Sequence, residues 1–166
     1  TLVGEMFRRS GFTTYVGGNI GVPLIEDVLN IPPESRVVLE LSSFQLEQLH
    51  TSPHVALVTN ISENHLDIHG TMADYTAAKT KIYQYQKRTD FAIFNLDDPI
   101  TAQMAGESRA QVFYFSGHNP VPQGAYIRGR ELVFQDPEGE RVFAYIDQVQ
   151  LPGRHNLENL LAAAVM

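Results

Sequence analysis

The sequence predicts an α/β fold, in which a mostly parallel sheet is flanked by helices and a small antiparallel β-meander follows near residues 124–146. Strand-like runs rich in β-branched and aromatic residues alternate with helix-like segments over residues 1–115, as in βαβ units. Beyond residue 124 the strand-like runs follow one another too closely for intervening helices, which indicates an antiparallel meander. A length of 166 residues is that of one domain with a sizeable core.

The first expected helix covers residues 1–9, because apolar side chains form one stripe along it and Gly11 can end it. Residues 13–16 are a short β-branched and aromatic strand. Pro23 is expected to open a second helix that runs through Leu29, since proline suits a first helical turn. The remaining expected strands are 37–41, 55–60, 91–95, 112–115, 125–128, 132–135 and 142–146, and the remaining expected helices are 44–49, 73–86, 97–104 and one that begins within 153–166.

Composition narrows the class of protein. Apolar residues make up 43% of the chain and charged residues 19%, which is typical of a soluble globular protein. No apolar run approaches the roughly 20 residues of a membrane span, and the first residues carry no signal-peptide pattern. The absence of cysteine excludes disulfides and thiolate metal sites, and is compatible with the cytoplasm. A net charge of −7 argues against nucleic acid as a partner, so anionic substrates would need positive charge from metal ions or helix ends.

Polar residues directly follow two of the apolar strands. The expected buried strand 37–41 contains Glu40 and is followed by Ser42 and Ser43. Ligands of open α/β sheets bind outside the carboxyl ends of the strands, so a site is expected there. Burying a carboxylate in an apolar strand costs free energy unless the group is paired or binds a metal, which makes Glu40 a candidate ligand. Capping a helix or pairing with an arginine would explain Glu40 equally, and both serines would then be ordinary turn residues.

The second apolar strand is followed by His65, Asp67 and His69. The pattern H-x-D-x-H supplies three metal ligands, although its spacing matches none of the common zinc motifs. A metal-dependent hydrolase that uses these three side chains with zinc or manganese is therefore one hypothesis. In the alternative, Asp67 caps a turn and both histidines lie on the surface.

Three further segments can carry chemistry. Lys79 lies on the expected helix 73–86, fourteen positions after His65, where a lysine is usually only a solvated charge. The segment 17–21, Gly-Gly-Asn-Ile-Gly, is either a turn or a place where the backbone can approach a phosphate. The segment 155–159, His-Asn-Leu-Glu-Asn, opens the last helix and is otherwise an N-cap with a polar first turn.

Taken in this order, these segments resemble the central, P-loop-NTPase-like domain of the Mur ligases, from GGNIG at residues 17–21 to HNLENLLAA at residues 155–163. The most discriminating piece is LELSSFQLE at residues 39–47, which is similar to the D-glutamate-adding members. The resemblance implies a bacterial, cytoplasmic ATP-dependent amide ligase of peptidoglycan precursor synthesis. It would join D-glutamate to UDP-N-acetylmuramoyl-L-alanine through an acyl phosphate, with no nucleic-acid partner and no membrane insertion.

The resemblance also implies roles for single residues. Catalysis would fall on Asn19, His65 and Lys79; Mg²⁺ on Glu40, His65 and a carbamylated Lys79; and ATP on Asn156, Asn159 and Asn19. A lysine made neutral by its surroundings can add carbon dioxide, and the carbamate is a two-oxygen anion suited to Mg²⁺. The turn Asn95-Leu96-Asp97-Asp98-Pro99 is expected to be structural, with Asp97 or Asp98 capping the next helix. Asn64 replaces the family's usual aspartate, and gives His65 a hydrogen bond without a charge.

Mur ligases carry a phosphate-binding loop, G-[TK]-x-G-K-[ST]-T, just before the helix that begins here at Thr1. The resemblance therefore implies that residues 1–166 are the central ATP-binding domain, with that loop, a uridine-nucleotide domain and an amino-acid-binding domain outside them. We predict that these residues alone bind ATP weakly and do not catalyse ligation. A scaffold without enzymatic activity is a third hypothesis, which the joint presence of five candidate residues argues against: Asn19, Glu40, His65, Lys79 and Asn156.

Overall fold

The structure, a computed structural model, describes residues 2–21, 23–62 and 70–166. The strands are β1 (Thr14–Gly18), β2 (Arg36–Glu40), β3 (Val55–Val58), β4 (Phe91–Asn95), β5 (Gln111–Ser116), β6 (Gly124–Arg128), β7 (Glu131–Asp136) and β8 (Gly139–Tyr145). The α-helices are α1 (Leu2–Arg9), α2 (Ser43–Glu47), α4 (Met72–Gln84), α5 (Pro99–Glu107) and α6 (Arg154–Val165). The short 3₁₀ turns are η1 (Leu24–Glu26), η2 (Val28–Asn30) and η3 (Ile146–Gln148).

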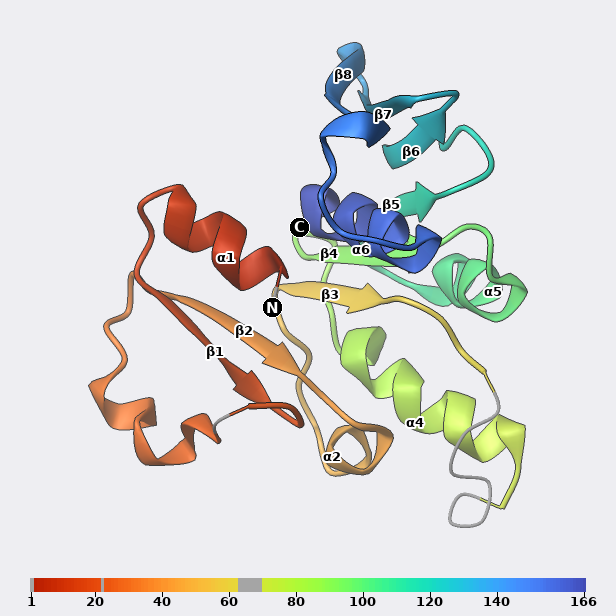
Figure 1. The fold of residues 1–166 in the computed structure, drawn as a ribbon. Coiled ribbons are helices and arrows are strands. Elements are labelled where there is room, and N and C mark those ends of the chain that lie inside the picture. Colours follow the sequence, from red (N-terminus) through yellow and green to blue (C-terminus); the bar gives the residue numbers. More distant parts are fainter. Residues whose placement is uncertain (1, 22, 63–69) are drawn as a thin grey trace.

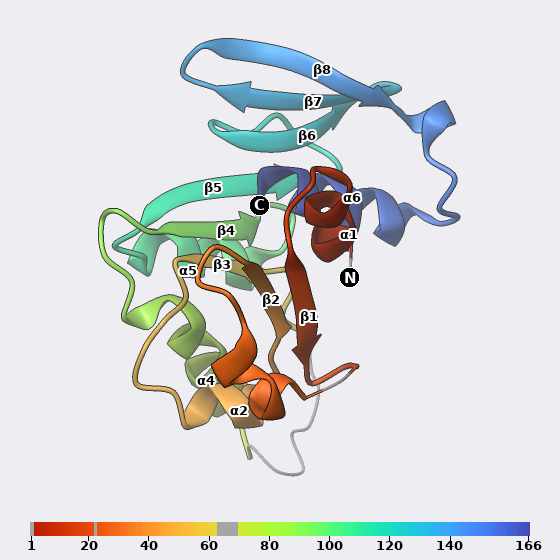
Figure 2. The same ribbon diagram turned by 90° about the vertical axis from the view of Figure 1, so that its left-hand side faces the viewer.

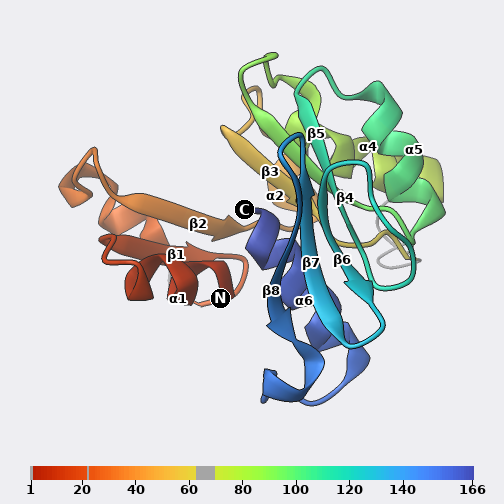
Figure 3. The same cartoon turned by 90° about the horizontal axis from the view of Figure 1, so that it is seen from above.

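Six strands form one sheet in the order β3-β4-β5-β6-β7-β8. The pairs from β3 to β6 are parallel, and the pairs β6–β7 and β7–β8 are antiparallel, so the predicted α/β class and the predicted meander are confirmed. Figure 2 shows the meander stacked above the parallel strands. A second, two-stranded parallel sheet pairs β1 with β2, and Figure 3 shows this pair apart from the six-stranded sheet.

The helices cover both faces of the six-stranded sheet. Side chains of β4 alternate, with Ala92 and Phe94 packing against α4 and α5, and Ile93 packing against α6. All three side chains are almost completely buried, which explains the continuous apolar run of β4. Helices α4 and α5 lie on one side and α6 on the other (Figures 1 and 2). No helix among the described residues is long and apolar enough to span a membrane.

The predicted helix from Pro23 to Leu29 is wrong, since the chain forms the two 3₁₀ turns η1 and η2 there. Short helices are stable mainly when an apolar face is buried against other elements. The apolar side chains Ile25 and Leu29 are 76% and 95% exposed, so this segment has no packing surface that would favour an α-helix.

The expectation that strand 37–41 is buried is also wrong. Val37 and Leu39 are 46% and 50% exposed, because β2 pairs only with β1 among the described residues. The helix that follows begins as a capping box: Ser42 Oγ accepts from the backbone N–H of Gln45, and the Gln45 side chain accepts from the Ser42 N–H.

Candidate active site

The carboxyl ends of β1 and β2 bring Asn19 and Glu40 together. Gly18 and Glu40 are partners in the parallel register. The Asn19 backbone N–H donates to the Glu40 carbonyl oxygen over 2.7 Å, and Asn19 Nδ2 donates to Glu40 Oε1 over 3.4 Å. Gly18 has φ +113°, and a Cβ there would lie 2.1 Å from the Glu40 carbonyl oxygen. Glycine is therefore required at this position for Asn19 to reach the end of β2.

Lys79 reaches the same region from α4. The helix begins at Thr71, whose Oγ1 accepts from the Asp74 N–H over 3.1 Å, and it packs against α2. Burial lowers the pKa of the partly buried Lys79 amine, and the nearby negative charge of Glu40 opposes that shift without cancelling it. The ammonium also lies 5.7 Å from the Tyr75 ring centroid. Lys79 therefore lies within electrostatic reach of Glu40, in surroundings that favour its neutral form.

The histidine cluster of the sequence falls outside the described residues, and with it the predictions for Asn64, His65, Asp67 and His69. Within the described ranges, no group of three or more His, Cys, Asp or Glu side chains could hold a metal ion. Glu40 and Lys79 are the two predicted magnesium ligands whose positions the structure gives. A carboxylate and a lysine carbamate would together offer hard oxygen donors, which fit Mg²⁺; their role as ligands stays a prediction.

Asn156 and Asn159 lie in the first turns of α6. Asn156 is partly buried, and its Nδ2 donates to the Pro152 carbonyl oxygen over 2.6 Å, which leaves Oδ1 to accept. Asn159 is exposed. The N-cap is Gly153, at φ +93°, and makes no side-chain cap. The two asparagines thus come from one helix end, and the structure does not bring them into contact with Glu40 or Lys79 through any described hydrogen bond.

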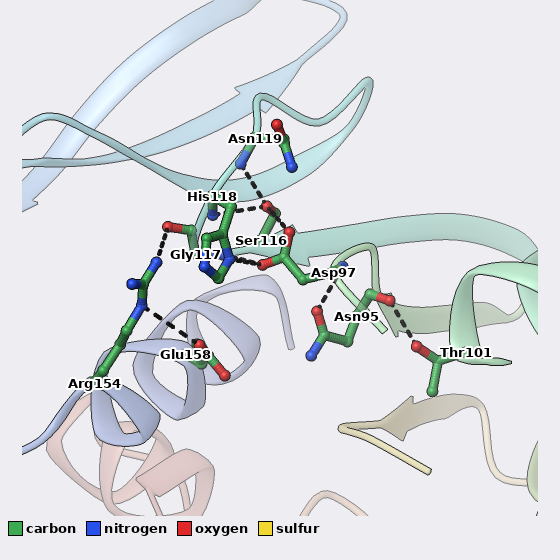
Figure 4. Close-up of polar contacts among 9 residues, drawn as sticks. All are labelled: Asn95, Asp97, Thr101, Ser116, Gly117, His118, Asn119, Arg154 and Glu158. Carbon is green, nitrogen blue, oxygen red and sulfur yellow. Dashed lines mark hydrogen bonds and ion pairs between the residues drawn. The ribbon is translucent and has the colours of Figure 1, made fainter. Parts of the chain in front are cut away.

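A polar network after β4 and β5 was not predicted (Figure 4). The Asp97 carboxylate accepts from Ser116 Oγ and the Gly117 N–H over 2.7 Å each, and pairs with His118 Nδ1 over 3.0 Å. Burial alone would raise the pKa of Asp97, but the bonds from His118, Ser116 and Gly117 outweigh it and the pKa lies below its ordinary value. Helix α5 is capped by Asp98 alone, whose Oδ1 accepts from the Ile100 and Thr101 N–H groups.

The sequence carried a signal for this network. Ser116 is the last residue of the apolar strand β5, and Gly117 and His118 follow it, so all three lie at the carboxyl end of a parallel strand, where α/β sheets bind ligands. Next to them is an open groove of about 710 Å³ between the turn after β5, the end of β6, η3 and the start of α6. Apolar side chains including Ile127 and Leu157 line it, and His118 and Arg154 add polar groups. Its size is in the range of small-ligand sites.

Comparison with known proteins gives the class of this α/β domain: the whole chain, residues 1–166, matches the Mur ligase middle domain, and the chain belongs to that family. It is 48% identical over 166 residues to a UDP-N-acetylmuramoylalanine–D-glutamate ligase from Symbiobacterium thermophilum, covering 98% of this chain and 36% of that protein. It is 44% identical over 163 residues to the ligase of the same name from Acetivibrio thermocellus, with 98% and 35% covered. The chain spans about a third of the length of these relatives.

Solved structures confirm the fold. MurF from Acinetobacter baumannii superimposes with a TM-score of 0.69 at 20% identity, covering 99% of this chain and 38% of that one. The MurF ligase from Thermotoga maritima in complex with ADP superimposes with a TM-score of 0.66 at 17% identity, covering 98% and 40%. None of these relatives is named as a hydrolase, so the comparisons give no support to the hydrolase hypothesis.

Proposed function

We propose that this chain is the ATP-binding middle domain of a ligase that adds D-glutamate to UDP-N-acetylmuramoyl-L-alanine in the bacterial cytoplasm. The similarity to enzymes of that name supports the substrates. The structural observation that carries the proposal is that Asn19 hydrogen-bonds Glu40 at the carboxyl ends of β1 and β2, within electrostatic reach of Lys79. The carboxyl ends of parallel strands are where α/β folds bind their ligands.

The reaction proceeds in two steps. The terminal carboxylate of UDP-N-acetylmuramoyl-L-alanine attacks the γ-phosphorus of ATP, which forms an acyl phosphate and releases ADP. The amine of D-glutamate then attacks the acyl carbon, the amide bond forms, and inorganic phosphate leaves. Phosphoryl transfer depends mainly on positioning and charge neutralisation, which is the contribution expected of this domain.

Lys79 contributes through the protonation state of its amine, which decides whether it can be carbamylated. Its lowered pKa raises the share of neutral amine at neutral pH, and only the neutral amine can add carbon dioxide to give a carbamate. That carbamate, Glu40 and His65 would hold Mg²⁺, which supplies neutralisation of the phosphate charge when bound. Asn19 holds the Glu40 carboxylate through its side-chain amide and fixes the end of β2 through its backbone.

The base end of ATP is assigned to the start of α6. Asn156 Oδ1 is free to accept from an exocyclic amine, because Nδ2 of the same side chain is used by Pro152. Asn159, one turn further, is exposed and offers both a donor and an acceptor. The neighbouring groove supplies apolar surface for a planar ring.

The test is ligation by the complete protein that contains this chain, measured as phosphate release that requires ATP, Mg²⁺ and D-glutamate together. Lys79→Ala is expected to lower turnover by at least roughly 100-fold, the scale on which removal of a preorganised catalytic group acts. The matched control is Lys81→Ala on the same helix, whose amine donates to the Tyr85 hydroxyl over 3.2 Å, and which should keep wild-type turnover. Full activity of Lys79→Ala, with unchanged circular dichroism in both variants, would overturn the assignment.

A further inference from the structure

The two ends of β4 carry similar acidic side chains with different connections. At the amino end, Asp90 pairs with His54 Nδ1 over 2.8 Å and accepts from the Lys87 N–H over 2.6 Å. At the carboxyl end, Asp97 makes the same two kinds of contact, with His118 and the Gly117 N–H. Both carboxylates are mostly buried, at 18% and 13% side-chain exposure. The two carboxylates differ in the further contacts of the segment whose backbone N–H each one accepts from.

Behind Asp97 lies a tightly bonded turn. Ser116 is fully buried, and its Oγ donates to Asp97 while accepting from the N–H groups of His118 over 3.1 Å and Asn119 over 2.8 Å. The Asp97 N–H is in turn held by Asn95 Oδ1 over 2.9 Å. The turn after β5 is therefore fixed to the end of β4 by one carboxylate (Figure 4).

Gly117 connects this turn to α6. Its carbonyl oxygen accepts from Arg154 Nη2 over 3.3 Å, and Arg154 Nε lies 4.0 Å from Glu158 Oε1. A Cβ on Gly117 would lie 3.3 Å from Glu158 Oε1 and 3.7 Å from Asp97 Oδ2. Gly117 thus lies between the Asp97 carboxylate and the Arg154 and Glu158 side chains in the first turns of α6.

We propose that Asp97 is a positioning residue for ATP: acting through Gly117 and Arg154, it fixes the start of α6, and so the asparagines that bind the base. This inference rests on the proposed function and deepens it, because it assigns a role in nucleotide affinity to a residue outside the predicted site. Asp97 does not contact the nucleotide and takes no part in bond making, so its loss affects binding of ATP more than turnover.

Asp97→Asn removes this function with little change in volume. Oδ1 serves Ser116, and Oδ2 serves both Gly117 and His118. An amide has one acceptor oxygen, so an –NH₂ group must face either the Gly117 N–H or the crowded Ser116 hydroxyl. In the first orientation the Gly117 N–H loses its acceptor, and in the second the Ser116 hydroxyl loses its acceptor, so one bond that holds the turn is lost or weakened either way. Asp90→Asn is the matched control, since it disrupts the same chemistry at the opposite end of the same strand.

The experiment compares the steady-state constants of the complete protein with both variants. Asp97→Asn is expected to raise KM for ATP roughly tenfold, the scale of a lost supporting contact, with kcat and KM for D-glutamate within about twofold of wild type. Asp90→Asn should lower thermal stability by a similar amount and leave KM for ATP unchanged. Gly117→Ala crowds Glu158, which lies 3.3 Å from the new Cβ, and reaches Asp97 Oδ2 only at an ordinary van der Waals distance of 3.7 Å. It should raise KM for ATP in the same way, and it replaces Asp97→Asn if that variant does not fold.

Equal effects of Asp97→Asn and Asp90→Asn on KM for ATP would overturn the proposal, as would a loss of kcat with an unchanged KM. A failure of the proposed function gives a different result, since the wild-type protein would then show no ATP-dependent ligation of D-glutamate. The two ideas are therefore tested separately by the same preparation.

Discussion

Gly18→Ala tests the junction between Asn19 and Glu40 most directly. The added Cβ would lie 2.1 Å from the Glu40 carbonyl oxygen and 2.9 Å from its backbone nitrogen, whereas Cβ atoms in real proteins do not approach other atoms within 3.0 Å. The ends of β1 and β2 must separate by about 1 Å to relieve this contact, because packed backbone atoms cannot be compressed. The separation breaks or lengthens the 2.7 Å bond from the Asn19 N–H.

The cost has two parts. A side chain at φ +113° costs about 1–2 kcal/mol, because L-residues disfavour this region. Loss of the backbone hydrogen bond adds about 0.5–1.5 kcal/mol. Gly139→Ala is the matched control: its φ is +123°, but no heavy atom lies within 4 Å of the new Cβ, so only the first cost applies.

Urea unfolding of the 166-residue chain gives the free energies, and phosphate release by the complete protein gives the activity. Gly18→Ala should lose about 1.5–3.5 kcal/mol and at least roughly tenfold in turnover, since both Asn19 and Glu40 are displaced. Gly139→Ala should lose about 1–2 kcal/mol and no activity. Equal stability losses together with unchanged turnover in Gly18→Ala would refute the view that close approach of these strands forms the site.

Three other predictions follow. Incubation with ¹³C-bicarbonate should give a carbamate resonance in the NMR spectrum of the complete protein that is missing in Lys79→Ala; its presence in both would place the carbamate elsewhere. Because the pKa of Asp97 is lowered below its ordinary 3.8, its stabilisation is present above pH 3.8 and disappears as the pH falls through the folded-state pKa. The difference in unfolding free energy between wild type and Asp97→Asn should therefore shrink on acidification, whereas a constant difference would contradict the role of the charge. Calorimetry of the 166-residue chain should show no Mg-ATP binding tighter than about 1 mM, since the sequence contains no G-x-x-x-x-G-K-[ST] loop; micromolar binding would show that other residues hold the phosphates.

Elements with strong local signals were predictable from the sequence. Strand β4 has the predicted bounds, 91–95, because its apolar run is bounded by Asp90 and by the turn that leads into α5. Helix α4 differs from its prediction, 73–86, only at its ends, since Thr71 supplies a cap. The prediction of a helix from Pro23 to Leu29 was wrong, because a short helix also needs a surface to pack on. No local sequence pattern indicates whether that surface exists.

The residues of the candidate site also divide into those with a local sequence signal and those that depend on tertiary packing. Glu40 was found through its place at the end of a strand, but its proximity to Lys79 depends on the packing of α2 against α4 and entered only through the family resemblance. The sequence predicted that Asp97 or Asp98 caps the next helix, and Asp98 does. The role of Asp97 was missed, because its partners lie 19 to 21 positions away in the chain. Capping is a local property that a pattern can indicate, whereas a carboxylate that joins two strand ends and a helix is a tertiary property.

The turn after β4 therefore does more than connect a strand to a helix. Its two adjacent carboxylates act in different directions: Asp97 holds the turn after β5, and Asp98 Oδ2 accepts from the Ile61 N–H over 2.8 Å while Oδ1 caps α5. Ile61 is 5% exposed and follows β3, four positions before His65 in the sequence. One rigid turn thus fixes the ends of both strands that flank β4, one leading toward the predicted metal ligand and the other bonded to the helix of the predicted base site. The β3–β4 and β4–β5 ladders set the spacing of the strands, and the two adjacent carboxylates hold the segments that follow β3 and β5 against the turn after β4. Under the proposed function this support is needed, because the phosphate and base ends of one ATP must be held at a constant distance.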